Sequence, residues 1–247
     1  MTQEISTDTC SCLGRQRART TRPVRFHAER QDTSAPGWRH LLALVEEAAA
    51  DGREEFRPLA ALTPGQRRQI VTLPPSIAKL TEVRHLNLYG SNLVRIPPEI
   101  GEMTSLRQFT PYTSYRLHWF PYELTRCANL RGSTVSTRAL YGNVKYRPPF
   151  PLLPPPSAGD GELDPGQLDP GIRGGEAVRG CSVCRQPIGQ AGLHQVWISL
   201  RVGADVLPLL VNACSAECVA ALPTPARDHV GVPHTGGPDL RQPPADG

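Results

Sequence analysis

Residues 73–96 read LPPSIAKLTEVRHLNLYGSNLVRI, and the pattern of this stretch returns twice further along the chain. Four columns of the pattern stay in phase over three copies, with spacings of 23 and then 24 residues. The columns are Pro74, Pro97 and Pro121; Ile77, Ile100 and Leu124; Leu80, Met103 and Cys127; and Val83, Leu106 and Leu130. A fixed period of this length is the signature of a repeat protein. Because one copy alone cannot bury its apolar side, we expect neighbouring copies to stack into a continuous core.

The apolar residues of the first copy, Val83, Leu86, Leu88 and Leu93, follow the spacing LxxLxLxxNxL. This spacing resembles that of leucine-rich repeats, in which a short strand and a looser return segment form each coil. The resemblance implies an α/β fold, namely a short leucine-rich repeat solenoid of about three coils over residues 73–147. Such an array needs a cap on each side.

The copies depart from the leucine-rich pattern at three positions. Ser91 replaces the asparagine of the pattern, which usually bonds the backbone along the turn of the coil. Pro111 stands in the second copy where Leu88 stands in the first, and Ser133 stands in the third copy where Leu86 stands. Because proline has no N–H to donate to a strand ladder, we expect the strand near Pro111 to be shortened or bulged.

Residues 35–72 are predicted to form a helical N-terminal cap. Trp38, Leu41 and Val45 fall on one face at helical spacing, and Gly52 closes the pattern. Further on, the run Thr63-Pro-Gly-Gln has a threonine at the N-cap, a proline at the first helical position and a glutamine placed to complete a capping box. A second, shorter helix is therefore expected to lead into the repeats.

Two close cysteine pairs, Cys181 with Cys184 and Cys214 with Cys218, are separated by 29 residues. Four thiolates in two such pairs can complete a tetrahedral shell around Zn²⁺. Apolar alternation over residues 195–211 predicts a hairpin between the pairs. We expect a helix to follow it, with Cys214 and Cys218 on one face at i and i+4.

The order of knuckle, hairpin and helix is similar to the treble-clef arrangement, which implies a small zinc domain over residues 180–223. Sulfur fills all four coordination positions, so the zinc is expected to be structural and to supply folding energy. The alternative is a redox CxxC, which needs only one pair and a thioredoxin-like βαβ context that the sequence lacks. Cys10 and Cys12 are two weaker candidate ligands, and Cys127 is explained by its apolar repeat column.

Three further segments are predicted to lack a packed structure: a basic tail over residues 1–34, a linker over residues 148–179 and a tail over residues 224–247. Residues 148–180 hold eight prolines and seven glycines. Such a composition is not expected to bury enough apolar area to offset the entropy lost on ordering.

Composition limits the environment of the protein. The start of the chain has no apolar run of the length of a signal peptide, and no stretch approaches the roughly 18 apolar residues of a membrane span. We therefore expect a soluble cytoplasmic protein without membrane contact, whose cysteines stay reduced. The net charge of +4 is too small to identify a partner.

The resemblance to leucine-rich repeats implies that side chains flanking the buried strand positions project onto a concave surface that commonly binds partners. Tyrosine, tryptophan and arginine dominate binding hot spots. The candidate partner-binding residues are Arg84, His85, Asn87, Tyr89, Arg107, Gln108, Tyr112, Tyr115, Arg116, Trp119 and Arg131. Two alternatives stay open, since the arginine column is also ordinary for an exposed position and the aromatic run over residues 112–122 can also fill the end of a core.

The sequence thus predicts a non-enzymatic scaffold or adaptor with an unidentified protein partner. The alternative is a zinc-dependent nucleic-acid-binding or regulatory protein, which is less favoured because only Arg179, Arg185 and Arg201 lie near the metal ligands. For catalysis, His118 would be a candidate base, with Cys127 or Ser133 as the candidate nucleophile. The sequence has no phosphate-binding glycine loop, nucleophile elbow or paired carboxylates, so we expect no enzyme.

Overall fold

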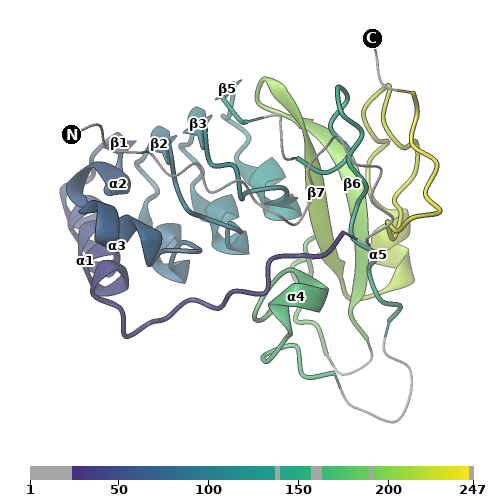
Figure 1. Cartoon of the computed structure of the whole chain (residues 1–247), viewed down its shortest axis with the longest axis horizontal. Coiled ribbons are helices and arrows are strands. Elements are labelled where there is room, and N and C mark those ends of the chain that lie inside the picture. The colour runs from purple at the N-terminus through teal and green to yellow at the C-terminus, as the bar shows by residue number, and fades with distance from the viewer. Residues whose placement is uncertain (1–23, 137–139, 157–162, 190–191, 245–247) are drawn as a thin grey trace, which may run out of the picture.

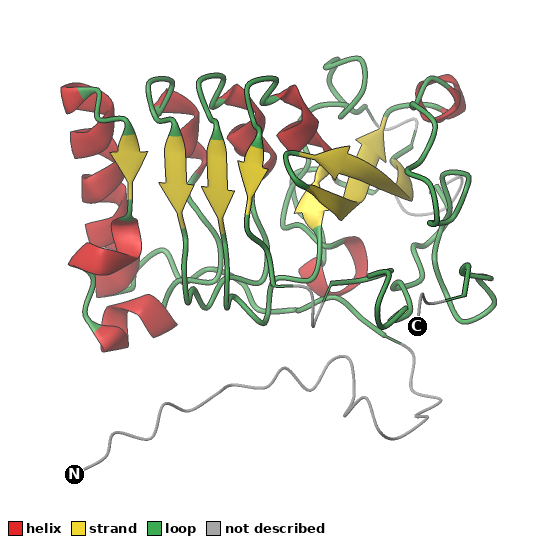
Figure 2. Ribbon diagram, turned by 90° about the horizontal axis from the view of Figure 1, so that it is seen from above, coloured by secondary structure: helices red, strands yellow, loops and turns green. Residues whose placement is uncertain are grey.

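The computed structural model describes residues 24–136, 140–156, 163–189 and 192–244. Its central feature is a row of short parallel strands, seen face-on in Figure 2. The strands are β1 (Glu55–Phe56), β2 (His85–Asn87), β3 (Gln108–Thr110) and β5 (Gly132–Ser133), in the order β1-β2-β3-β5. Equivalent repeat positions face each other, since His85 pairs with Gln108 and Gln108 with Gly132. This register is consistent with a short leucine-rich-repeat-like array.

Each coil carries a short 3₁₀ helix after its proline column (Figure 1). These helices are η2 (Pro75–Lys79), η3 (Pro98–Glu102) and η4 (Tyr122–Arg126). The apolar columns point inward, and Ile77, Ile100 and Leu124 are completely buried. Strand β3 ends before Pro111, but it has the same length as β2, which ends at the equivalent residue Asn87, so the shortening or bulge expected near Pro111 is not observed.

The cap begins with α1 (Pro36–Asp51), which ends at Gly52 in the left-handed conformation that glycine adopts without strain. The short helices α2 (Pro58–Ala61) and α3 (Pro64–Arg68) follow, and Thr63 and Gln66 form the predicted capping box. The cap is not purely helical, because β1 pairs with β2 and Phe56 is buried beside Leu86. The array therefore starts one strand earlier than the repeat columns predict.

The predicted hairpin is present as β6 (His194–Val202) and β7 (Asp205–Ala213), followed by the short helix α5 (Ala216–Ala220). The hairpin does not stand apart from the array. Strand β4 (Phe120–Pro121), which belongs to the third coil, pairs in parallel with β7, with Phe120 opposite Leu209. At the hairpin turn, the Ser133 hydroxyl donates to the Asp205 carboxylate at 2.6 Å. The cysteine-bearing segment therefore closes the end of the array (Figure 1).

One hydrophobic core consequently runs from α1 through the coils to the hairpin. The described part of the expected linker, residues 148–156 and 163–179, is packed and contains the short helix α4 (Pro170–Arg173). Leu168 and Val178 belong to this core, and Phe150 and Leu153 belong to a second cluster of buried residues. For example, the Trp197 indole Nε1 donates to the Pro151 carbonyl at 3.0 Å, and Leu153 N–H donates to the Thr235 carbonyl at 2.8 Å. These contacts contradict the prediction of a mobile linker for the residues that the structure describes.

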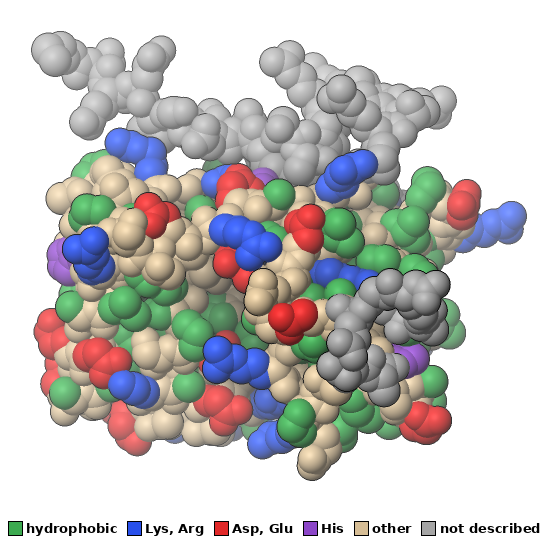
Figure 3. All heavy atoms as spheres, turned by 90° about the horizontal axis from the view of Figure 1, so that it is seen from below, with side chains coloured by type: hydrophobic (Ala, Val, Ile, Leu, Met, Phe, Trp, Pro, Cys, Tyr) green, Lys and Arg blue, Asp and Glu red, His purple; other side chains and the backbone are tan. Residues whose placement is uncertain are grey.

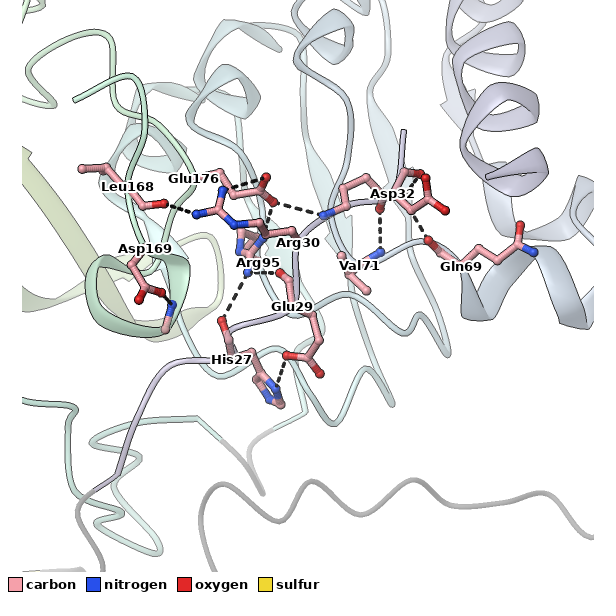
Figure 4. Close-up of polar contacts among 12 residues, drawn as sticks. His27, Glu29, Arg30, Asp32, Gln69, Val71, Arg95, Leu168, Asp169 and Glu176 are labelled. Atoms are coloured by element: carbon pink, nitrogen blue, oxygen red, sulfur yellow. Dashed lines mark hydrogen bonds and ion pairs between the residues drawn. The ribbon is translucent and has the colours of Figure 1, made fainter. Parts of the chain in front are cut away.

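The described parts of both expected tails are also packed. Residues 24–35, which we call the strap, cross the underside of the array and are held by a polar network around Arg95 (Figure 4). Residues 224–244 bond to the hairpin, because the Trp197 and His234 backbones donate to each other. The earlier arginines of the basic tail, with Cys10 and Cys12, lie outside the described residues.

An aromatic cluster explains why these proline- and glycine-rich segments are ordered. It joins residues far apart in the sequence: Phe26, Trp119, Tyr141, Phe150 and Trp197. The rings of Phe26 and Phe150 each lie 5.5 Å from the ring of Trp197. A few large anchors therefore bury apolar area that the average composition of these segments does not reveal. No helix within the described residues is long and apolar enough to cross a membrane.

Burial of His234 predicts acid sensitivity of this end of the molecule. Its Nδ1 accepts from Gly236 N–H at 3.1 Å, and its ring lies 4.7 Å from that of Phe150. Burial lowers the pKa of His234 to about 4. In the unfolded chain His234 has a pKa near 6.5 and is protonated at pH 5, whereas in the folded chain it stays neutral at that pH. Protonation therefore favours the unfolded chain, and the free energy of unfolding should fall by about 2 kcal/mol between pH 7 and pH 5.

Denaturant unfolding at both pH values tests this expectation. His234→Gln should remove most of the loss on acidification, whereas the matched control His229→Gln, in the same segment, should retain it. An unchanged pH dependence in His234→Gln would show that another group causes the acid sensitivity.

Candidate functional site

The four predicted metal ligands meet at one end of the molecule, although two precede the hairpin and two follow it. Cys181 and Cys184 lie in a tight turn before β6, Cys214 follows the end of β7, and Cys218 lies in α5. Their sulfur atoms all lie within 4.8 Å of one another. The Sγ–Sγ distances are 3.5 Å from Cys184 to Cys214 and 3.6 Å from Cys214 to Cys218.

These distances fit a tetrahedral ion. Four sulfurs at about 2.3 Å from one zinc stand about 3.8 Å apart, close to the observed separations. The cluster can therefore hold a metal ion. The predicted helix position is partly wrong: Cys214 precedes α5 rather than lying on it, because Ser215 is the N-cap and accepts from Cys218 N–H.

The backbone prepares Cys181 to act as a thiolate. Its sulfur accepts from the N–H groups of Val183 at 3.4 Å, Cys184 at 3.5 Å and Cys214 at 3.4 Å. Burial alone would raise the pKa of Cys181, but these hydrogen bonds lower it to about 7. Deprotonation makes sulfur a better ligand for a cation.

The third coil contacts the cysteine turn directly, a link that the sequence analysis missed. Arg126 in η4 donates to the carbonyl of Ser182 at 3.0 Å. Ser182 in turn exchanges backbone and hydroxyl hydrogen bonds with Asn212 at 2.7 and 2.9 Å. Arg126 lies 56 residues from Ser182, and no motif in the sequence relates the two.

The outer face of the β1-β2-β3-β5 sheet carries most of the predicted partner-binding residues. Tyr89 and Tyr112, just beyond β2 and β3, are 58% and 45% exposed, with ring centroids 6.0 Å apart. Tyr115 is also exposed, and His85, Asn87 and Gln108 lie on the strands. We call this area, defined by β1, β2, β3, β5 and the three tyrosines, the strand face.

The arginine column lies at the edge of the strand face. Arg84 pairs with Glu54 at 2.6 Å. Arg107 and Arg131 are exposed, and neither forms an ion pair within the described part of the chain. Two neighbouring guanidinium groups without acidic partners leave positive charge available to a ligand.

Two predicted partner-binding residues are instead structural. Trp119 is only 6% exposed, and its ring packs in a T-shaped geometry 5.7 Å from that of Phe26. Arg116 bonds to the Asn92 side chain at 3.1 Å and pairs with Glu29 of the strap. The part of the aromatic run that includes Trp119 thus fills the core, because the hairpin and the strap cover it.

Each residue considered for catalysis is engaged in core packing or in a structural hydrogen bond. Cys127 donates to the Ile100 carbonyl at 3.2 Å, and burial raises the pKa of its thiol to about 12. His118 is buried against the Tyr141 ring, and Ser133 bonds to the hairpin turn. A thiol that stays protonated at neutral pH is a poor nucleophile.

Comparisons with known proteins find similarity among solved structures alone. No family model and no curated protein matches the chain. Among solved structures, a leucine-rich repeat protein of Leptospira interrogans is similar, with 23% sequence identity and a TM-score of 0.25. The match covers 32% of this chain and 20% of that chain, so this protein spans a small part of its relative. The chain is thus distantly similar, over about a third of its length, to a leucine-rich repeat protein.

Proposed function

We propose that the protein is a non-enzymatic interaction protein, a scaffold or adaptor that binds a protein partner through the strand face. The observation that carries the proposal is the exposed pair Tyr89 and Tyr112 on adjacent coils. Tyrosine is enriched at interfaces, because it combines a large apolar ring with a hydrogen-bonding hydroxyl. Arg107 and Arg131, which form no ion pair with any described residue, add positive charge along the same coils.

The four-cysteine cluster holds a structural zinc ion in this proposal. The donor set supports this choice, since four thiolates select zinc or iron–sulfur clusters over hard cations. The spacing of the sulfurs fits a single ion. Zinc would fix the loop of Cys181 and Cys184 to the segment of Cys214 and Cys218, and no ligand position would remain open for substrate.

Alanine substitution of both Tyr89 and Tyr112 tests the strand face. We expect capture of the partner from native cell extract to weaken at least about tenfold, as for interface hot spots. The melting temperature should change little, because both rings are already in solvent. Quantitative affinity capture with the purified full chain as bait measures the first result, and thermal unfolding measures the second.

Tyr146→Ala is the matched control. Tyr146 is 46% exposed, close to the value for Tyr112, but it lies in a turn after β5 and is not part of the strand face. Its replacement should leave capture unchanged. Equal losses of capture in the control and the double variant would indicate nonspecific adhesion, and unchanged capture in the double variant would refute the strand face as the binding surface.

A further inference from the structure

The underside of the array, opposite the strand face, contains a cleft of about 490 Å³. Its coil wall is formed by the proline edges of η2 and η3, and residues 175–181 form the other wall. Trp38, Leu73 and Pro97 contribute to an apolar floor. Figure 3 views this face and shows hydrophobic side chains in a hollow that charged side chains surround. Its volume falls in the range of about 300–1,000 Å³ typical of ligand sites.

The cleft spans successive coils, from η2 to η4 and the cysteine turn. An elongated shape of this kind suits an extended chain. The wall of residues 175–181 also offers main-chain bonding groups. One edge of this segment is used internally, since Glu176 accepts from Leu168 at 2.8 Å and Val178 donates to Pro165 at 2.7 Å.

The alternate groups of the same segment are available to a ligand. The N–H groups of Ala177 and Arg179 have no hydrogen-bond partner among the residues that the structure describes. Extended peptides bind to such edges by adding a strand, in which main-chain bonds give affinity and side-chain contacts give specificity. The geometry therefore favours a polypeptide over a compact small molecule.

Two arginines at the cleft identify the charge of the ligand. Arg179 and Arg185 line the cleft and are exposed, and neither has a side-chain hydrogen bond or ion pair within the described ranges. The other arginines of the cleft are engaged, Arg95 by Glu176 and Arg126 by the cysteine turn. The positive charge left for a ligand thus lies on the side of the cysteine turn.

The backbone of Arg185 is a second, independent observation. Its φ is +65°, a left-handed conformation that is strained for a residue with a side chain and almost free of strain for glycine. The turn needs this conformation, because Arg185 N–H donates to the Cys181 carbonyl at 3.0 Å. The Arg185 side chain makes no hydrogen bond or ion pair with any described residue, so it does not stabilise the turn. A strained arginine at this position is explained if its guanidinium binds a ligand.

We propose that the cleft binds an extended peptide segment with an acidic side chain, which Arg179 and Arg185 recognise. The apolar floor receives the neighbouring side chains, and the segment around Ala177 bonds to the peptide main chain. Glu99 and Glu102 lie on the coil wall and repel an acidic side chain from there, which fixes the orientation of the peptide. This site goes beyond the proposed function, because it lies on the opposite face of the array.

An arrayed library of acetylated hexapeptides tests the proposal, with glutamate, glutamine or lysine placed in turn in a fixed apolar frame. The metal-loaded full chain should bind the best glutamate peptide at least about tenfold more tightly than its lysine counterpart, as charge complementarity predicts. The double variant Arg179→Glu/Arg185→Glu should reverse this preference. Arg227→Glu, an exposed arginine elsewhere, is the control and should not alter it.

Arg185→Gly separates binding from folding. Glycine relieves the strained turn, so the melting temperature should stay equal or rise, while the affinity for the glutamate peptide should fall about fivefold, as expected for one partly exposed charge contact. The double alanine variant of Tyr89 and Tyr112 should bind the peptides normally, which distinguishes this site from the strand face. Absence of peptide binding, or a charge preference that survives the double reversal, would overturn the proposal.

Discussion

Replacement of Cys214 by serine is expected to destabilise the whole chain, and not the cysteine segment alone. The wild-type protein should contain about one zinc per chain by elemental analysis, and the variant should lose most of it, because three thiolates and a hydroxyl bind zinc poorly. Binding to cysteine sites supplies folding free energy of about 10 kcal/mol or more in small zinc domains, so its loss should exceed the effect of any ordinary core mutation.

The structure explains why the damage should spread. Strand β7, which leads into Cys214, pairs with β4 of the third coil, and Arg126 of the same coil bonds to the cysteine turn. In a stacked array the terminal element shields the core of the last coil. We therefore expect a single unfolding transition shifted down by more than about 10 °C, in contrast to local unfolding of a separate module.

Calorimetry of the purified variant measures this shift, and chelation of the wild-type protein should reproduce it. Cys127→Ala is the control, since it removes a buried thiol outside the cluster and should keep the zinc. Metal-free wild-type protein with an unchanged melting temperature would contradict the zinc proposal. Two separate transitions in Cys214→Ser, with the array unaffected, would contradict the shared core.

Replacement of Arg95 by methionine is expected to lower the free energy of unfolding by about 3 kcal/mol, near the lower end of the cost of breaking a buried ion pair. The Arg95 side chain is 6% exposed and bonds to Glu176 at 2.9 Å and to the His27 carbonyl at 3.2 Å. Methionine keeps the volume but leaves the strap carbonyl without its donor. Glu176 is 34% exposed and can regain water, which limits the cost.

Arg84→Met provides a matched control, because the same substitution removes an exposed ion pair with Glu54. Its effect should stay below about 1 kcal/mol, as is usual for surface pairs. Urea unfolding of both variants measures the difference. Limited proteolysis should also cut the strap faster in Arg95→Met, since Arg95 connects the strap to residue 176 (Figure 4). Equal effects of the two substitutions would show that the network around Arg95 adds no stability.

Elements with local or periodic sequence signals could be predicted from the amino-acid sequence. The repeat columns predicted the coils, since every copy must present the same apolar positions to its neighbours. Glycine at residue 52 and the Thr63 capping box predicted helix ends, because capping depends on a few adjacent residues. The cysteine spacing likewise predicted the ligand cluster before its geometry was known.

The way in which these parts are joined could not be predicted, because it depends on contacts between distant segments of the folded chain. The sequence around Trp119 and Arg116 does not show whether these side chains lie at an interface or in the core. Their positions depend on contacts with Phe26 and Glu29 of the strap. The order of the segment near Phe150 depends on a few rings meeting Trp197, which average composition hides. The β4–β7 pairing could not be predicted either, because backbone hydrogen bonds between segments almost ninety residues apart produce no periodic pattern in the sequence. Helix caps, repeat columns and ligand spacings depend on residues within one segment and can be predicted from it, whereas contacts between distant segments form only when the chain folds.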